Sequence, residues 1–225
     1  MTFSISGFCQ KTGMVGVAIT TSSICVASRC PWVKAGVGAA STQNITDPSL
    51  GNLMLDNLEK GLNVEESIDK IVKEHKFIQY RQLSLLDTKG NSASFTGSKT
   101  LGTNAVSKGE GCIAAGNLLS SVNVVKAMCD FFSVNKNLQL AERLLLSLKT
   151  GFDAGGEEGP VHSSGLKIAH EYSWPLVDLR IDWTNNNPIT ELISLWHTYE
   201  PQMKDYNLRA TDPSQAPSYG VLGDL

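Results

Sequence analysis

The segment TFSISGFCQKTGMVGVAITTSS, residues 2–23, decides how the chain begins to fold. Its first five residues alternate between polar and apolar, which is typical of a half-buried β-strand. A polar turn at residues 11–13 precedes a second apolar run at residues 14–20, so a hairpin is predicted. A strand directly behind Met1 is unusual, because chain ends are ordered only where something holds them. This raises the hypothesis that Thr2 functions as the N-terminal residue of the protein.

Downstream, strand-like runs alternate with helix-like ones. Strands are expected at residues 25–28, 29–42, 81–97 (a hairpin that turns at 87–90), 163–171 and 175–183. A first helix is expected at residues 48–60, and a second follows a cap formed by Asn63 and Glu66 and includes residues 64–72. Further helices are expected around residues 124–132, at 138–148 and from Pro188 onward. Hairpins that alternate with helix pairs predict an α+β fold, a four-layer αββα sandwich of two antiparallel sheets with outer helices. Residues 1–200 are predicted to form a single domain, and residues 201–225 an extended tail that packs on the domain or on a second subunit.

Composition excludes several classes of protein. The chain has 225 residues, of which 41% are hydrophobic and 18% charged, as in ordinary globular proteins. A net charge of -3 provides no basic surface for nucleic acid. No apolar run approaches the ~20 residues that cross a bilayer, so no membrane association is predicted. The N-terminus lacks a basic segment followed by an apolar one, so a cytoplasmic location is expected.

Common metal and cofactor motifs are also missing. The five cysteines are scattered, form no C-x-x-C pair and have no histidine at a useful spacing, so free, mostly buried thiols are expected. The segment AGVGAAS, residues 35–41, has no βαβ unit around it and fits a glycine-rich buried strand better than a dinucleotide loop. Neither H-E-x-x-H nor G-x-S-x-G occurs. The sequence therefore predicts neither a metal nor an organic cofactor.

An N-terminal threonine would supply both a nucleophile and its base. The free α-amino group has a pKa of about 7.7–8.0 and is able to take the hydroxyl proton. This chemistry requires removal of Met1, for which the small Thr2 is suitable. The competing interpretation is that many chains start with Met-Thr and that nothing follows from it.

The sequence resembles a known family. Segments that carry the resemblance are the opening residues 2–23, PWVKAGVGAASTQ, RQLSLLDTKGNSASFTG, AAGNLLSS, LAERLLLSLKTGFDAGGEEGPVHSSGL, VDLRIDW and PSYGVLGD. Together they resemble, nearly end to end, the uncharacterised family called domain of unknown function 1028. That family is placed among the N-terminal-nucleophile (Ntn) hydrolases and shares the αββα sandwich of proteasome subunits.

The resemblance implies Thr2 as the nucleophile and draws attention to polar residues within apolar segments. The catalytic candidates are Thr2 and Asn117. The substrate-binding candidates are Ser28, Arg29, Gln43, Glu157 and His162. Many relatives carry a stretch similar to GGDRRGRQSAAL where this chain reads GGEEGPVHSSGL, residues 155–166. This departure implies a different substrate.

Each candidate also has a structural interpretation. Arg29 could bind a substrate carboxylate or pair with a buried acid. Asn117, and similarly Gln43, could stabilise an oxyanion or serve local structure. Glu157 and His162 occupy a loop, where function and helix termination are both common. Asp178 and Arg180 are expected to form a structural pair on one strand.

The function predicted from these observations is that of an amidohydrolase. Thr2 would attack a small amide or cyclic amide, a non-peptide C–N bond, and form a covalent acyl-enzyme that water hydrolyses. The alternative is a non-catalytic protein that keeps the Ntn-hydrolase fold and binds a small metabolite, held by Arg29. A homo-oligomer, most simply a dimer, is expected in both cases.

Overall fold

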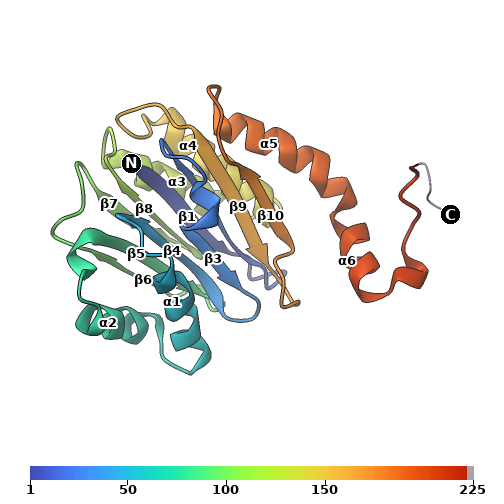
Figure 1. Ribbon diagram of the computed structural model, residues 1–225, viewed down its shortest axis with the longest axis horizontal. Helices are drawn as coiled ribbons and strands as arrows, with labels where there is room; N and C mark the ends of the chain where they lie inside the picture. Colours follow the sequence, from blue (N-terminus) through green and yellow to red (C-terminus); the bar gives the residue numbers. More distant parts are fainter. Residues whose placement is uncertain (222–225) are drawn as a thin grey trace.

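The computed structural model describes residues 1–221, which fold into four layers (Figure 1). A six-stranded sheet has the order β10-β9-β2-β1-β8-β7, and a four-stranded sheet has the order β3-β4-β5-β6. The strands are β1 (Thr2–Phe8), β2 (Val15–Thr21), β3 (Pro31–Lys34), β4 (Gly38–Asn44), β5 (Arg81–Asp87), β6 (Ser92–Thr96), β7 (Ala105–Gly109), β8 (Cys112–Asn117), β9 (Ser163–Ala169) and β10 (Val177–Ile181). Every neighbouring pair in both sheets is antiparallel.

The helices cover the outer faces of the two sheets (Figure 1). α1 (Ser49–Glu59) and α2 (Val64–Glu74) pack on the four-stranded sheet. α3 (Asn123–Val134), α4 (Leu140–Asp153) and α5 (Pro188–Tyr199) pack on the six-stranded sheet. The predicted α+β sandwich with outer helices is therefore confirmed.

Alternation along β1 divides its side chains between two environments. Phe3 and Ile5 are fully buried in the core against α3 and α4. Thr2 and Ser4 lie on the opposite face, because successive side chains of a strand point to opposite sides. That face looks toward the four-stranded sheet, where the Ser4 hydroxyl meets Gln43 of β4.

The space between the sheets is apolar at one end and polar at the other. The apolar end holds a cluster formed by Val15, Val17, Ala39, Leu86, Ile113 and Ala169. The polar end holds buried serine, threonine, glutamine and asparagine side chains, beside the start of β1. Burying polar groups costs free energy unless they are hydrogen-bonded, so a polar end between two sheets points to a functional reason.

Two local features of the sandwich differ from the predictions. The segment predicted as a strand at residues 25–28 forms a 3-10 turn instead, η1 (Val26–Ser28), after Cys25 at φ 56°. Its backbone groups bond to side chains: the Val26 amide donates to Ser163 Oγ at 3.1 Å, and the Cys25 carbonyl accepts from Ser28 at 2.7 Å and from Arg29 at 2.8 Å. Strand β7 was not predicted.

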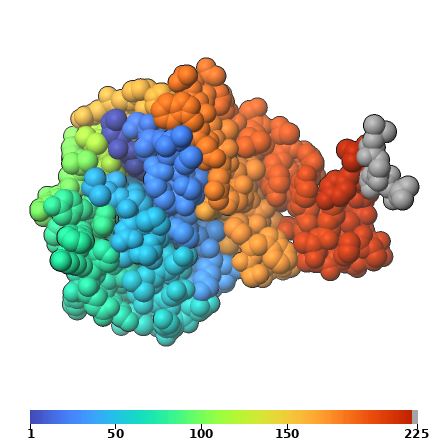
Figure 2. Space-filling view, in the orientation of Figure 1, coloured from blue at the N-terminus to red at the C-terminus, as the bar shows by residue number. Residues whose placement is uncertain are grey.

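The C-terminal segment also departs from the predicted extended tail. Two short 3-10 turns, η3 (Glu200–Gln202) and η4 (Pro213–Gln215), flank a helix, α6 (Met203–Thr211). Figures 1 and 2 show this segment projecting from the body of the molecule beyond α5. Residues 222–225 of the predicted tail lie outside the described residues. Packing of the tail on a second subunit stays a prediction.

Candidate functional site

Thr2 lies at the polar end of the space between the sheets. It pairs with Asn117 of β8, and the hairpin register, which opposes Phe3 to Thr20, brings Thr21 beside it. The Thr2 residue is only 5% exposed, and its Oγ1 lies 3.2 Å from Thr21 Oγ1. Both hydroxyls donate to the carbonyl oxygen of Met1, that of Thr2 at 2.5 Å. A carbonyl oxygen is therefore already bound beside the candidate nucleophile.

A buried network of amide side chains lies behind Thr2. Ser4 Oγ donates to Gln43 Oε1 at 2.9 Å, and Gln43 Nε2 donates to Gln82 Oε1 at 2.8 Å. Asn117 Nδ2 donates to the same Gln82 oxygen at 3.2 Å, and Gln82 Nε2 donates to the Gly116 carbonyl at 3.0 Å. The network fixes the Asn117 amide, whose Oδ1 has no hydrogen-bond partner among residues 1–221.

Glu157 brings a carboxyl group to this end of the molecule. Its residue is 6% exposed, and within the described part of the chain neither carboxyl oxygen accepts a hydrogen bond of good geometry, although the backbone amide of Ser22 lies near. Burial raises the pKa of Glu157 to about 8, although the α-amino group of Met1 and the backbone amide of Ser22 act in the opposite direction. At pH 7 the carboxyl is therefore mostly neutral, and it lies close enough to the N-terminus to interact with its charge.

His162 and Trp183 border the site through the end of β2. The His162 amide donates to the Thr21 carbonyl at 2.8 Å, and its ring stacks on Trp183 with centroids 4.4 Å apart. His162 Nδ1 lies 2.8 Å from the Thr184 carbonyl, which only accepts, so Nδ1 carries a proton. The ring orientation is thus fixed by contacts on both sides.

Arg29 is held by neutral groups. Its guanidinium donates to the carbonyls of Ile24 and Cys25, and its Nη2 donates to Ser23 Oγ at 2.7 Å. Ser23 Oγ in turn lies 3.3 Å from Thr21 Oγ1, which connects Arg29 to the site. Neither a substrate carboxylate nor a buried acid is needed to explain these contacts, and a role for Arg29 in substrate binding stays a prediction.

The predicted site residues are thus brought together unequally. Thr2 and Asn117 are cross-strand neighbours, Gln43 joins them through Gln82, and Glu157 lies near the N-terminus. Ser28 is exposed and its hydroxyl bonds to the Cys25 carbonyl, so its predicted binding role has no contact to support it. Elsewhere, Asp178 and Arg180 form the expected pair through two hydrogen bonds of 2.8 Å.

Sequence reasoning missed Thr21 and Leu118. Thr21 follows directly from the predicted hairpin, because any register that opposes residues 3 and 20 places residue 21 beside residue 2. Leu118, which follows Asn117, has φ 50°, a left-handed conformation that is rare for leucine and occurs often at functional sites. The local sequence contains no residue pattern that predicts this conformation.

The described residues hold no group of three or more His, Cys, Asp or Glu side chains suited to a metal ion. None of the helices in residues 1–221 is both long and apolar enough to cross a membrane.

Solved structures similar to this chain include a member of an uncharacterised family and two proteins called Anbu. A crystal structure of a DUF1028 protein from Silicibacter pomeroyi is 30% identical, with a TM-score of 0.82 over 88% of each chain. Anbu (ancestral beta-subunit) from Yersinia bercovieri is 11% identical, with a TM-score of 0.37 over 97% of this chain and 100% of its own. A Gly-1 mutant of Anbu from Hyphomicrobium sp. strain MC1 is 12% identical, with a TM-score of 0.40 over 98% and 100%. At these values the two Anbu likenesses carry no conclusion about this chain.

No curated protein matches the sequence. The model of the Family of unknown function (DUF1028) matches residues 2–192, so the chain belongs to that family.

Proposed function

We propose that this protein is an amidohydrolase that uses Thr2 as an N-terminal nucleophile after removal of Met1. The observation that carries the proposal is the placement of the Thr2 hydroxyl. It is held at the start of a buried strand, directly after Met1 and 3.2 Å from a second hydroxyl. Removal of Met1 would leave the α-amino group on the residue that carries the nucleophile.

The Met1 carbonyl supports a binding position for a substrate carbonyl. Its oxygen accepts from the hydroxyls of both Thr2 and Thr21, and that space becomes free when Met1 is removed. A substrate carbonyl in the same position would meet the Thr21 hydroxyl as a donor and the Thr2 hydroxyl as a nucleophile. Asn117 lies across from Thr2 and, in this proposal, is the second polar group that faces the developing oxyanion.

The chemical steps follow from this arrangement. Thr2 Oγ1 attacks the amide carbon while the α-amine takes the hydroxyl proton. The C–N bond then breaks, and the ammonium returns this proton to the departing nitrogen. Water then attacks the resulting ester while the α-amine takes a proton from the water. The bond between the acyl carbon and Thr2 Oγ1 breaks, the ammonium returns this proton to Oγ1, and the product leaves as the free acid. No oxidant, metal or cofactor enters these steps.

The environment of Glu157 favours a neutral amide as substrate. A carboxyl with a pKa of about 8 is mostly protonated at pH 7, so it offers both an O–H donor and a carbonyl acceptor. A cyclic amide presents a matching N–H and C=O on one edge. Because Glu157 lies close enough to the N-terminus for their charges to interact, a small amide or cyclic amide is the substrate class that we propose.

Turnover and acyl-enzyme trapping test this function together. Purified protein is incubated with a panel of small lactams and primary amides and, separately, with a β-lactone that acylates nucleophilic hydroxyls. We expect amide hydrolysis, and lactone labelling that peptide mapping assigns to Thr2. Thr2→Ala should lose both, Thr2→Ser should retain labelling, and the exposed control Thr103→Ala should behave as the parent protein.

Two results would overturn the proposal. One is turnover in Thr2→Ala equal to that of the parent. The other is amide binding that is equal in the parent and Thr2→Ala, with no hydrolysis or labelling in either, which would favour the alternative of a non-catalytic binding protein.

A further inference from the structure

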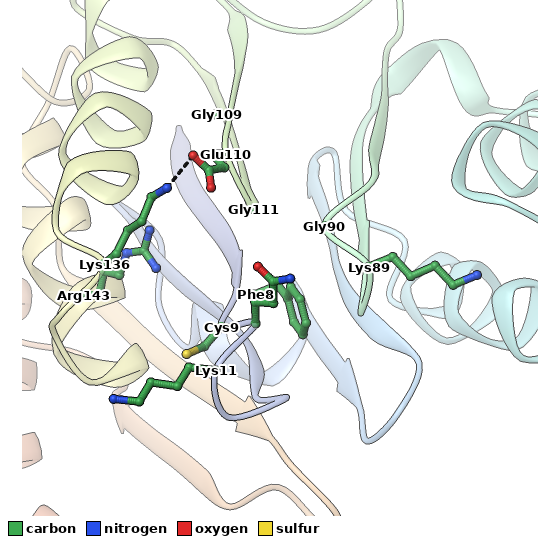
Figure 3. A pocket seen from close by; sticks show the side chains of 11 residues that line it. Phe8, Cys9, Lys11, Lys89, Gly90, Gly109, Glu110, Gly111, Lys136 and Arg143 are labelled. Atoms are coloured by element: carbon green, nitrogen blue, oxygen red, sulfur yellow. Dashed lines mark ion pairs between the residues drawn. The ribbon is translucent and has the colours of Figure 1, made fainter.

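A cavity lies at the opposite end of β1 from Thr2. It has a volume of about 580 Å³ and is lined by residues that include Phe8, Cys9 and Gly111 (Figure 3). Thr2 and Phe8 are the two ends of β1, six positions apart, which corresponds to roughly 20 Å at ~3.4 Å per residue. The cavity is therefore separate from the Thr2 site.

The charge around this cavity contrasts with that of the whole chain. Four cationic side chains line it, those of Lys11, Lys89, Lys136 and Arg143, against the single carboxylate of Glu110. The protein as a whole has a net charge of -3. Figure 3 shows Arg143 and Lys136 together on one wall, with Lys11 and Lys89 extending outward from the rim.

Arg143 is the unusual group of this cavity. Its residue is only 5% exposed, its Nε donates to the Phe132 carbonyl at 2.6 Å, and its guanidinium carbon lies 3.5 Å from the centre of the Phe132 ring. These contacts fix the plane of the guanidinium but use one of its five N–H donors. Within residues 1–221 the two terminal nitrogens have no hydrogen-bond partner, and they belong to the lining of the cavity.

Glu110, the carboxylate among the described residues that line the cavity, already pairs with another cation. Lys136 Nζ lies 2.5 Å from Glu110 Oε2. Lys136, and more weakly Arg143, lower the pKa of Glu110, so this carboxylate is charged at neutral pH. Two cations thus lie near one anion, and the guanidinium of Arg143 has no bidentate partner in the part of the chain that the structure describes.

We propose that this cavity binds a small molecule bearing an oxyanion, a carboxylate or a phosphate, through the terminal nitrogens of Arg143 with Lys136 beside them. A planar guanidinium held by packing is pre-organised for two parallel N–H···O bonds. If Arg143 of α4 served only to bind the Phe132 carbonyl near the end of α3, its Nε bond would be enough. The open cavity leaves room for the ligand, and Glu110 competes with it for both cations.

Calorimetric titration at constant ionic strength tests the site, with inorganic phosphate and succinate as separate probes. Saturable binding of one equivalent of at least one probe is expected. Lys136→Ala, an exposed position, and Arg143→Gln should weaken binding, the second by about tenfold or more because charge-assisted bonds are lost. Glu110→Gln should strengthen binding severalfold, because it removes the competing carboxylate. Lys126 and Asp130 form a similar exposed ion pair on α3, so the controls Lys126→Ala and Asp130→Asn should leave the binding of both probes unchanged.

The outcomes separate the possible ligands and decide the proposal. Binding of phosphate alone or succinate alone assigns the class of oxyanion, and binding of both supports a general oxyanion site. Absence of saturable binding for both probes would overturn the proposal. Equal weakening by Lys126→Ala and Lys136→Ala would do so as well. If Arg143→Gln fails to fold, the opposite effects of Lys136→Ala and Glu110→Gln still decide it.

Discussion

At the scale of single residues, Glu157 is the feature that most needs explanation. A buried carboxyl with no hydrogen bond of good geometry in the described chain destabilises the fold whenever it is ionised. Its pKa of about 8, against an ordinary value of 4.5, shows that the fold holds it in the neutral form. Such a shift, next to a candidate nucleophile, is the pattern expected of a functional group.

The Glu157 shift predicts how stability depends on pH. Because the folded-state pKa is raised, this contribution to stability is complete below about pH 4.5 and is lost as the pH rises through about 8. The loss is at most ~5 kcal/mol, since one pKa unit corresponds to about 1.4 kcal/mol. Glu157→Gln should therefore have a flatter profile of unfolding free energy between pH 4 and pH 9, measured by urea denaturation. The exposed control Glu158→Gln should keep the parent profile, and parallel profiles for parent and Glu157→Gln would show that this residue is not the source.

At the scale of elements, α1 is joined to the four-stranded sheet by a close contact between Gly51 and Trp32. An added Cβ at Gly51 would lie 2.0 Å from Trp32 Cδ1, nearer than any real packing contact. Trp32 Nε1 also donates to the Arg29 carbonyl at 3.3 Å, so the indole is held from both sides. This contact sets how closely the helix approaches the sheet.

Gly51→Ala is predicted to destabilise the protein although alanine is the better helix former. The gain in helix propensity is about 1 kcal/mol, whereas forcing a methyl group into a packed interface costs about 1–3 kcal/mol. A net loss of roughly 1 kcal/mol in unfolding free energy is expected from chemical denaturation. Asn52→Ala, exposed on the same helix, isolates the propensity effect and should cause no loss. An increase in stability for Gly51→Ala would mean that Trp32 moves aside freely.

Elements with local signals were predictable, and those that depend on distant partners were not. The Asn63 and Glu66 capping box is present, with both reciprocal bonds at 2.9 Å, because its residues are three apart. The turn at η1 replaces the predicted strand because Ser163 and Arg29 satisfy its backbone groups, and Ser163 is 137 positions from Val26. The helix α6 lacks a strong pattern and was predicted as an extended tail.

The same division applies to the candidate site. Thr2 could be selected from the sequence because its chemistry depends only on its position in the chain. The burial of Glu157 and the connection from Gln43 to Asn117 through Gln82 arise from the packing of two sheets. No local sequence pattern predicts which side chains of different strands come into contact. The residue types at the site were therefore predictable, and their geometry was not.

At the scale of the whole molecule, the two ends of the sandwich differ in chemistry. One end holds Thr2 with its polar network, and the other holds the cavity beside Arg143. A third region, the arm formed by α6 and the turns around it, projects from the body (Figure 2). Exposed aromatic side chains gather at this arm, including Trp174, Tyr206 and Tyr219, which are 40%, 42% and 57% exposed.

These aromatic side chains support the prediction that the protein is a homodimer. Aromatic residues are enriched at interfaces, where their rings are buried by the partner. Sedimentation equilibrium should give a dimer for the full chain and a shift toward monomer for Trp174→Ser combined with Tyr206→Ser. Phe77→Ser, a similarly exposed position in the segment after α2, should leave the association unchanged. A monomeric parent chain would refute this prediction.

The central claim is that Thr2 acts as an N-terminal nucleophile, and the state of the first residue tests it most directly. The measurement is the intact mass of the protein made from its own start codon in its own organism, with sequencing of the N-terminal peptide. We predict a chain that is lighter by one methionine residue and begins with threonine. Quantitative retention of Met1 would deprive Thr2 of its own amine, and the mechanism proposed for this site would then be wrong.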